Sequence, residues 1–210
     1  MSRYAKLTVG LVAAWLTFSV IASALDLYRT GQGQPPLALG LAVLIPIVVF
    51  LVWFARSAAF RQFALSLNPR VLTFVQSWRV AGFVFLVLAA YGILPRIFAL
   101  PAGWGDILIG ATAPLVGWKL ASAGRRRSFM LWQALGIADL VMAVSLGTLA
   151  SVLDPHGIPT SPLTVLPLSL IPTFAVPLLL ILHVICIAQA KRWPARPSVP
   201  AGAQVRSQMA

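Results

Sequence analysis

Residues 71–93 read VLTFVQSWRVAGFVFLVLAAYGI, an apolar stretch interrupted by a single charged residue, Arg79. About 20 consecutive apolar residues are enough for a helix to cross the hydrocarbon core of a bilayer. A charge inside that core costs about 2.5–3.5 kcal/mol on insertion scales, so a chain that keeps one usually has a use for it. The stretch therefore predicts a transmembrane helix that carries a polar site.

The composition of the whole chain is that of a membrane protein. Of its 210 residues, 60% are hydrophobic and only 10% are charged, whereas about 25% of the residues of a soluble domain are charged. Six apolar stretches predict six spans, near residues 8–27, 37–55, 71–93, 103–121, 129–150 and 165–188. We expect an all-α membrane protein, a six-transmembrane-helix bundle with short loops that forms one domain over residues 1–190. A disordered basic cytosolic tail is expected at 191–210.

Lysine and arginine predict how the bundle lies in the membrane, because cytoplasmic loops carry an excess of both. With a cytoplasmic N-terminus, thirteen of the sixteen basic residues fall on the inside, and only Arg29 and Arg96 fall outside. We therefore expect a multi-pass protein of the plasma or inner membrane with both termini cytoplasmic. The net charge of +12 then reflects topology and contact with anionic lipid headgroups, and no nucleic-acid partner is expected. A signal peptide cleaved after residues 22–24 is the alternative for the first span, but an uncleaved helix agrees better with the basic loops.

Polar side chains inside the spans form the main candidate site. At a helical rise of ~1.5 Å per residue, Arg79, Asp139 and His183 lie about 12, 15 and 8 Å from the cytoplasmic face. Gln76 and Gln133 lie nearer that face on the third and fifth spans. Because arginine keeps its proton in lipid, it needs a partner, and Asp139 is the only carboxylate expected at its depth. The alternative is a structural ion pair that locks the third span against the fifth.

A second group of charged residues is expected at the outer face. Asp26 and Arg29 end the first span, Arg96 follows the third, and Asp106 opens the fourth behind a glycine-rich turn. The glycines could expose backbone amides to a ligand. The alternative is that Asp106 is a first-turn carboxylate favoured by the helix dipole and that the glycines only make the turn.

Several chemistries are excluded by the motifs that the sequence lacks. It contains no Walker loop, no HExxH, no GxSxG and no glutamate, so the standard hydrolase and ATPase sites are absent. Its one cysteine, Cys186, lies in the last span and cannot supply a cysteine metal cluster. We expect no cofactor and no metal, and an enzyme is less expected than a protein without catalytic activity.

Three classes of function remain. The first is transport or capture of a small anionic or protonatable solute at Arg79, Asp139 and His183, by a single chain, a homo-oligomer or a subunit of a larger membrane complex. The second is an intramembrane enzyme that acts on a lipid or quinone. The third is a non-catalytic assembly or regulatory membrane subunit. Prolines at 162, 167, 172 and 177 also predict an irregular entry to the last span, with regular helix from about Thr173.

Overall fold

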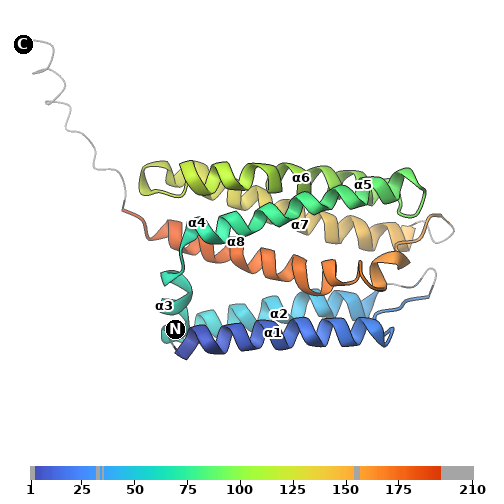
Figure 1. Cartoon of the computed structure of the whole chain (residues 1–210), viewed down its shortest axis with the longest axis horizontal. Coiled ribbons are helices and arrows are strands. Elements are labelled where there is room, and N and C mark those ends of the chain that lie inside the picture. Colours follow the sequence, from blue (N-terminus) through green and yellow to red (C-terminus); the bar gives the residue numbers. More distant parts are fainter. Residues whose placement is uncertain (1–2, 32–33, 35, 154–156, 195–210) are drawn as a thin grey trace, which may run out of the picture.

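The computed structural model describes residues 3–31, 34, 36–153 and 157–194, and the regular structure in these residues is all helical. Within this described part, six helices are long and apolar enough to cross a membrane, and this number agrees with the six predicted spans. They are Arg3–Ala24, Leu37–Arg56, Pro69–Ala90, Arg96–Lys119, Ala123–Ala150 and Ile171–Lys191. The spans run side by side, and the start of the first lies at the same end of the bundle as the end of the last (Figure 1). The tail predicted to be disordered lies, from residue 195 on, outside the described residues.

The third span is not one regular helix. It consists of α4 (Pro69–Val75), the 3₁₀ helix η1 (Gln76–Gly82) and α5 (Phe83–Ala90). Asn68 caps α4, because its side chain accepts a hydrogen bond from the backbone N–H of Arg70 at 2.9 Å. A 3₁₀ helix has three residues per turn, so residues three apart lie above one another. The buried residues of η1 are Gln76, Arg79 and Gly82, and this spacing turns all three toward the interior.

The segment between the second and third spans, expected to be a short loop, contains a helix. Here α3 (Ala58–Ser66) joins α2 (Leu37–Arg56) to α4. Ser57 accepts a hydrogen bond from the N–H of Phe60 at 3.2 Å and caps the start of α3. Arg61 donates to the carbonyls of Phe54 and Ala55, both at 3.1 Å. These carbonyls belong to the last turn of α2 and lack helical partners, so Arg61 holds the corner between the two helices.

The fourth span begins earlier than the sequence predicts. Helix α6 covers Arg96–Lys119 and includes Pro101 and the glycines at 103 and 105, which were expected to form a turn before Asp106. Proline is tolerated in a transmembrane helix when neighbouring groups satisfy the backbone that it frees. Asp106 consequently lies in the third turn of α6, about 15 Å of helical rise from Arg96. Its expected place in the first turn is wrong.

The entry to the last span is irregular, as the prolines predict. It contains the short 3₁₀ helix η3 (Ser161–Thr164) and the π-helical turn η4 (Ile171–Ala175), and α8 begins only at Val176 and ends at Lys191. In a regular helix the carbonyl of Thr173 would accept from residue 177, but Pro177 has no N–H. Instead, Trp15 Nε1 of α1 (Arg3–Ala24) donates to this carbonyl at 3.1 Å. A side chain from the first span thus satisfies a carbonyl freed by proline.

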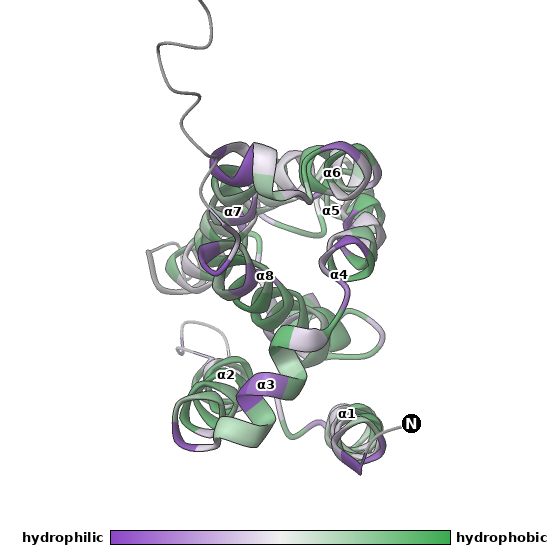
Figure 2. Cartoon of the chain, turned by 90° about the vertical axis from the view of Figure 1, so that its left-hand side faces the viewer, coloured by the Kyte–Doolittle hydropathy of each residue, from purple (hydrophilic) through white to green (hydrophobic). Residues whose placement is uncertain are grey.

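Helix α8 lies between two groups of helices (Figure 2). It packs against α4 and α7 (Arg126–Leu153) on one side and against α2 on the other, while α1 contacts mainly η4 and α3. Two large apolar clusters fill the interior. One lies around Phe60, Phe129 and Trp132 at the α3 end of the bundle. The other lies around Phe85 and Phe98 at the opposite end.

Candidate functional site

The centre of the candidate site is the guanidinium group of Arg79, whose side chain is only 1% exposed. Its Nε donates to Asp106 Oδ1 at 2.7 Å, and its Nη2 forms an ion pair with Asp139 Oδ2. Its Nη1 donates to the carbonyl of Gly136 at 3.2 Å and lies 3.4 Å from His183 Nε2. All three nitrogens are therefore engaged, by groups from α6, α7 and α8. We call Arg79, Asp106, Asp139 and His183 the Arg79 cluster.

Asp106 is the member of the cluster that the sequence interpretation assigned to the wrong place. It was expected at the outer face, in a group separate from Arg79, with Asp139 as the only carboxylate at the depth of the arginine. The two carboxylates instead share one guanidinium, with side chains 16% and 10% exposed. The predicted pairing of Arg79 with Asp139 is confirmed, but it is one of two ion pairs that Arg79 forms.

Glycines make the space in which these side chains meet. A Cβ atom on Gly105 would collide with the carboxylate of Asp139, and one on Gly136 would collide with the imidazole of His183. Gly82 faces Asp106 in the same way, with a Cβ placed 2.8 Å from Oδ2. Each polar side chain therefore lies against the backbone of a neighbouring helix. Small residues allow helices in a membrane to approach this closely.

His183 connects the cluster to a chain of hydrogen bonds that runs toward the α3 end of the bundle. A guanidinium can only donate, so His183 Nε2 accepts from Arg79 and the ring proton is on Nδ1. Nδ1 lies 2.5 Å from Gln133 Oε1, and Gln133 Nε2 donates to Thr73 Oγ1 at 3.1 Å. Thr73 donates to the carbonyl of Pro69 at 2.8 Å. All these hydrogen bonds run from donor to acceptor in the same direction, from Arg79 toward Pro69. The chain of hydrogen bonds therefore holds the neutral imidazole against Arg79.

Gln76 is buried but does not join the chain of hydrogen bonds that contains Gln133. Its Nε2 donates to the carbonyl of Leu179 at 3.1 Å, which ties η1 to α8. Its Oε1 is buried and has no hydrogen-bond partner among the described residues. Thr73 takes part in that chain of hydrogen bonds instead, a role that the sequence analysis did not assign to it. The only signal in the sequence was that Thr73 is a polar residue one turn before Gln76.

The outer candidates other than Asp106 do not form a site. Arg29 Nη1 lies 3.5 Å from Asp26 Oδ2, in a pair whose side chains are 64% and 49% exposed. Such a pair contributes little to stability because water screens it. Arg96 lies at the first residue of α6 and makes no ion pair within the described part of the chain. The structure therefore brings Asp106 to Arg79 and leaves Asp26, Arg29 and Arg96 outside the cluster.

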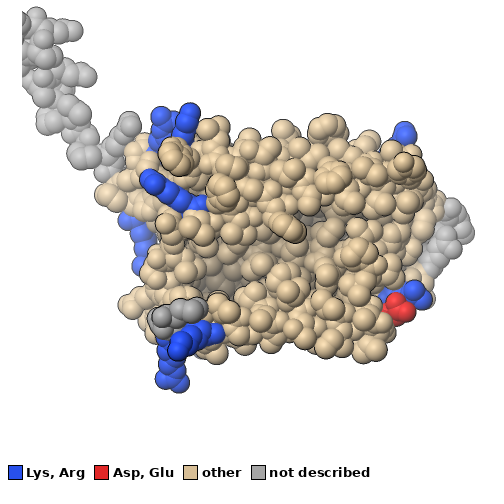
Figure 3. Space-filling view, in the orientation of Figure 1, with Lys and Arg blue, Asp and Glu red and all other residues tan. Residues whose placement is uncertain are grey.

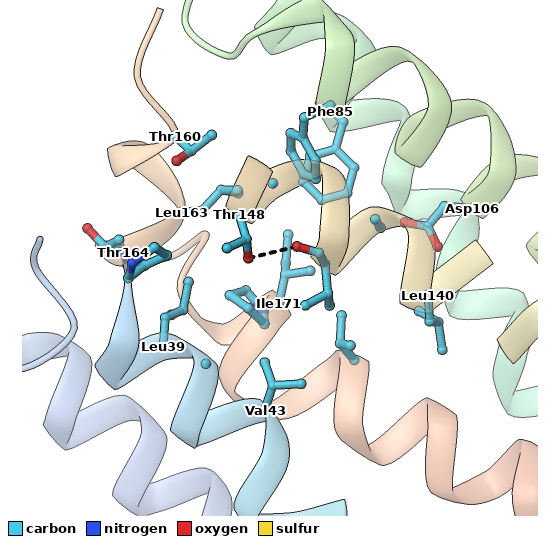
Figure 4. Close-up of a pocket in the computed structure, with 18 residues that line it drawn as sticks. Leu39, Val43, Phe85, Asp106, Leu140, Thr148, Thr160, Leu163, Thr164 and Ile171 are labelled. Atoms are coloured by element: carbon cyan, nitrogen blue, oxygen red, sulfur yellow. Dashed lines mark hydrogen bonds between the residues drawn. The ribbon is translucent and has the colours of Figure 1, made fainter. Parts of the chain in front are cut away.

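An apolar cavity of about 80 Å³ lies beside the cluster, between α2, α7 and the entry to the last span. Asp106 is at one end of it, near Leu140 and Phe85, and Thr160 and Thr164 are at the other (Figure 4). Among the described residues that line it, Asp106 is the only one with a charged side chain. The cavity therefore leads from the polar cluster into the half of the bundle away from α3.

Metal binding is not suggested by the residues that the structure describes, since no three His, Cys, Asp or Glu side chains among them could hold an ion. In the cluster the position between the carboxylates is taken by the Arg79 guanidinium. The positive charge that stabilises the two carboxylates is thus part of the chain itself.

Comparison with known proteins identifies a family without a known activity. No curated protein and no solved structure matches the chain significantly. Residues 34–190 match the family described as Domain of unknown function (DUF8737). The match contains every member of the Arg79 cluster and the cavity, and it begins after α1. Since it covers most of the sequence, the chain belongs to the DUF8737 family.

Proposed function

We propose that this protein transports or captures a small protonatable solute, and that the solute binds at the Arg79 cluster. The observation that carries the proposal is one arginine shared by two carboxylates next to a cavity. With both carboxylates ionised, Arg79, Asp106 and Asp139 have a formal charge of −1. A buried site of this kind is stabilised by one more positive charge, which a proton or a protonated solute can bring.

An anionic solute fits the cluster less well. Every nitrogen of Arg79 already has a partner, so an anion would have to displace Asp106 or Asp139. It would also bring a second negative charge next to the remaining carboxylate, and like charges at this distance repel strongly when water is excluded. We therefore prefer the protonatable solute of the two classes that the sequence left open.

The proposed orientation places the end that contains α3, the start of α1 and the end of α8 in the cytoplasm of a plasma or inner membrane. Lysine and arginine side chains gather at this end, and few are seen at the other (Figure 3). The positive-inside rule supports this placement, and the same residues would contact anionic lipid headgroups. The apolar cluster around Phe60 and Phe129 lies between the Arg79 cluster and this end of the bundle. Solute would then reach the Arg79 cluster from the outer half.

A thermal-shift screen of the purified protein tests the function. A ligand that binds only the folded state stabilises it by about 2.7 kcal/mol at 100 times its Kd. We expect hits among amines and other protonatable solutes, with stabilisation lost in Asp106→Asn and Asp139→Asn and kept in the surface control Asp26→Asn. Hits confined to anions, or hits whose stabilisation depends on Asp26, would refute the proposal.

A further inference from the structure

We propose that the solute is a small cationic amphiphile, whose ammonium group lies at Asp106 and whose apolar body occupies the cavity between α2 and α7. This inference rests on the proposed function and specifies the class of its substrate. It is carried by the apolar lining of the cavity, by the free carboxylate oxygen at its inner end and by its size.

The walls of the cavity select an apolar body. Val43 of α2, Phe85 of α5 and Leu140 of α7 contribute to it, together with Val176 at the start of α8. Its few polar side chains are Asp106 and the threonines at 148, 160 and 164. Binding sites for small molecules are mostly apolar, with a few polar groups that fix the orientation of the ligand. Among the described lining residues, the charged side chain, Asp106, lies at the inner end, and the threonines at 160 and 164 lie at the other end (Figure 4).

Asp106 can receive a cation without losing its bond to Arg79. Arg79 Nε uses Oδ1, and Oδ2 has no hydrogen-bond partner among the described residues. The carboxylate is also partly exposed, and it is part of the cavity lining. An ammonium group donates up to three hydrogen bonds and accepts none, so it suits a carboxylate oxygen. It also brings the positive charge that the cluster lacks.

The size of the cavity limits the body of the ligand. Its volume of about 80 Å³ is roughly half that of an engineered cavity of ~150 Å³ that binds benzene. An alkyl chain of a few carbon atoms therefore fits inside, and the end of a longer chain must leave through the open side. We expect affinity to increase about fourfold for each methylene that the cavity can hold and then to level off.

Matched n-alkyl amines, alcohols and carboxylates of four to eight carbons test this inference on the purified full-length protein in nanodiscs. We expect the amines to raise the unfolding temperature most, the alcohols less and the carboxylates not at all. The alcohols have the same apolar body, so their difference from the amines isolates the contribution of the charge. Carboxylates that bind as well as amines of equal length would overturn both this inference and the proposed function.

Two glycines provide a cavity variant and its control. Gly40 lines the cavity and Gly10 lies on α1, and a Cβ atom at either position meets no atom within 4 Å. A Cβ atom at either position therefore causes no clash in the bundle. We expect Gly40→Leu to reduce amine affinity at least tenfold and to abolish its dependence on chain length, while Gly10→Leu leaves both unchanged. Amine binding that is lost in Asp106→Asn but insensitive to chain length and to Gly40→Leu would refute the amphiphile and leave the proposed function standing.

Discussion

Single residues in the Arg79 cluster are stabilised by one another rather than by water. Arg79 is nearly inaccessible, and its two carboxylate partners come from different helices. Removing one member of a buried charged group costs about 3–5 kcal/mol, because the remaining charges lose their partner. Substitutions of such residues therefore have strongly coupled effects on the free energy of unfolding.

The first prediction concerns this coupling. We expect Arg79→Gln to lower the free energy of unfolding by about 3 kcal/mol or more, because it leaves Asp106 facing Asp139 without a cation. In an Asp106→Asn/Asp139→Asn background the same change should cost at least about 1 kcal/mol less. Reversible unfolding in mixed micelles measures both costs, and equal costs in the two backgrounds would show that the charges do not interact.

The second prediction concerns the glycine beside His183. We expect Gly136→Ala to destabilise the protein by about 1–3 kcal/mol, because the added methyl group occupies the place of the imidazole. Gly10→Ala, where the methyl group meets nothing within 4 Å, should be neutral or slightly stabilising. The unfolding temperatures of the two variants provide the comparison. A Gly136→Ala protein as stable as the control would place His183 elsewhere.

At the scale of elements, α1 is joined to the bundle mainly through the irregular entry to the last span. Besides Trp15, Ser19 Oγ lies 3.5 Å from the carbonyl of Thr173, and Ser169 donates to Ser23 Oγ at 2.8 Å. The bonds to Thr173 exist because proline leaves the backbone of this segment without its usual donors. The contribution of these α1 hydrogen bonds to stability therefore depends on Pro177.

The third prediction tests this link. We expect Trp15→Phe to cost about 1 kcal/mol, the contribution of one hydrogen bond, since the aromatic contact of this residue with Phe174 is retained. In a Pro177→Ala background the carbonyl of Thr173 gains a helical donor, so the cost should fall by half or more. A double-mutant cycle on unfolding free energies measures this difference. A cost that is the same in both backgrounds would contradict the account.

The sequence predicted the spans well but misplaced the start of the fourth. Hydropathy identifies a span because lipid contact needs only apolar side chains, and this criterion is local. The depth of Asp106, in contrast, depends on whether Pro101, Gly103 and Gly105 are helical, and packing decides this. Gly103 and Gly105 lie where a Cβ atom would collide with Leu86 and Asp139. Contacts between helices distant in sequence thus set the position of the carboxylate, and one sequence alone does not reveal them.

At the scale of the whole molecule, the proposed orientation rests on the asymmetric distribution of basic residues. The fourth prediction is that a reporter active only outside the cytoplasm gives no signal after Arg127 and a strong signal after Gly157. The first position lies at the basic start of α7, and the second follows its opposite end. The charge difference between the two ends favours this orientation. The reverse pattern of signals would invert the bundle and place the cavity on the cytoplasmic side.

The separation of the three charges along the chain has a consequence for membrane insertion during synthesis. Asp106 follows Arg79 by 27 residues and Asp139 follows it by 60, so the arginine reaches the translocon before either partner does. Until they arrive, the third span must carry the cost of an unpaired charge, about 2.5–3.5 kcal/mol. We expect a nascent chain that stops after α5 to insert this span less efficiently than one that continues through α7, as glycosylation mapping would measure. Arg79→Leu should remove the difference, and efficient insertion of the short wild-type chain would show that the arginine needs no later helix.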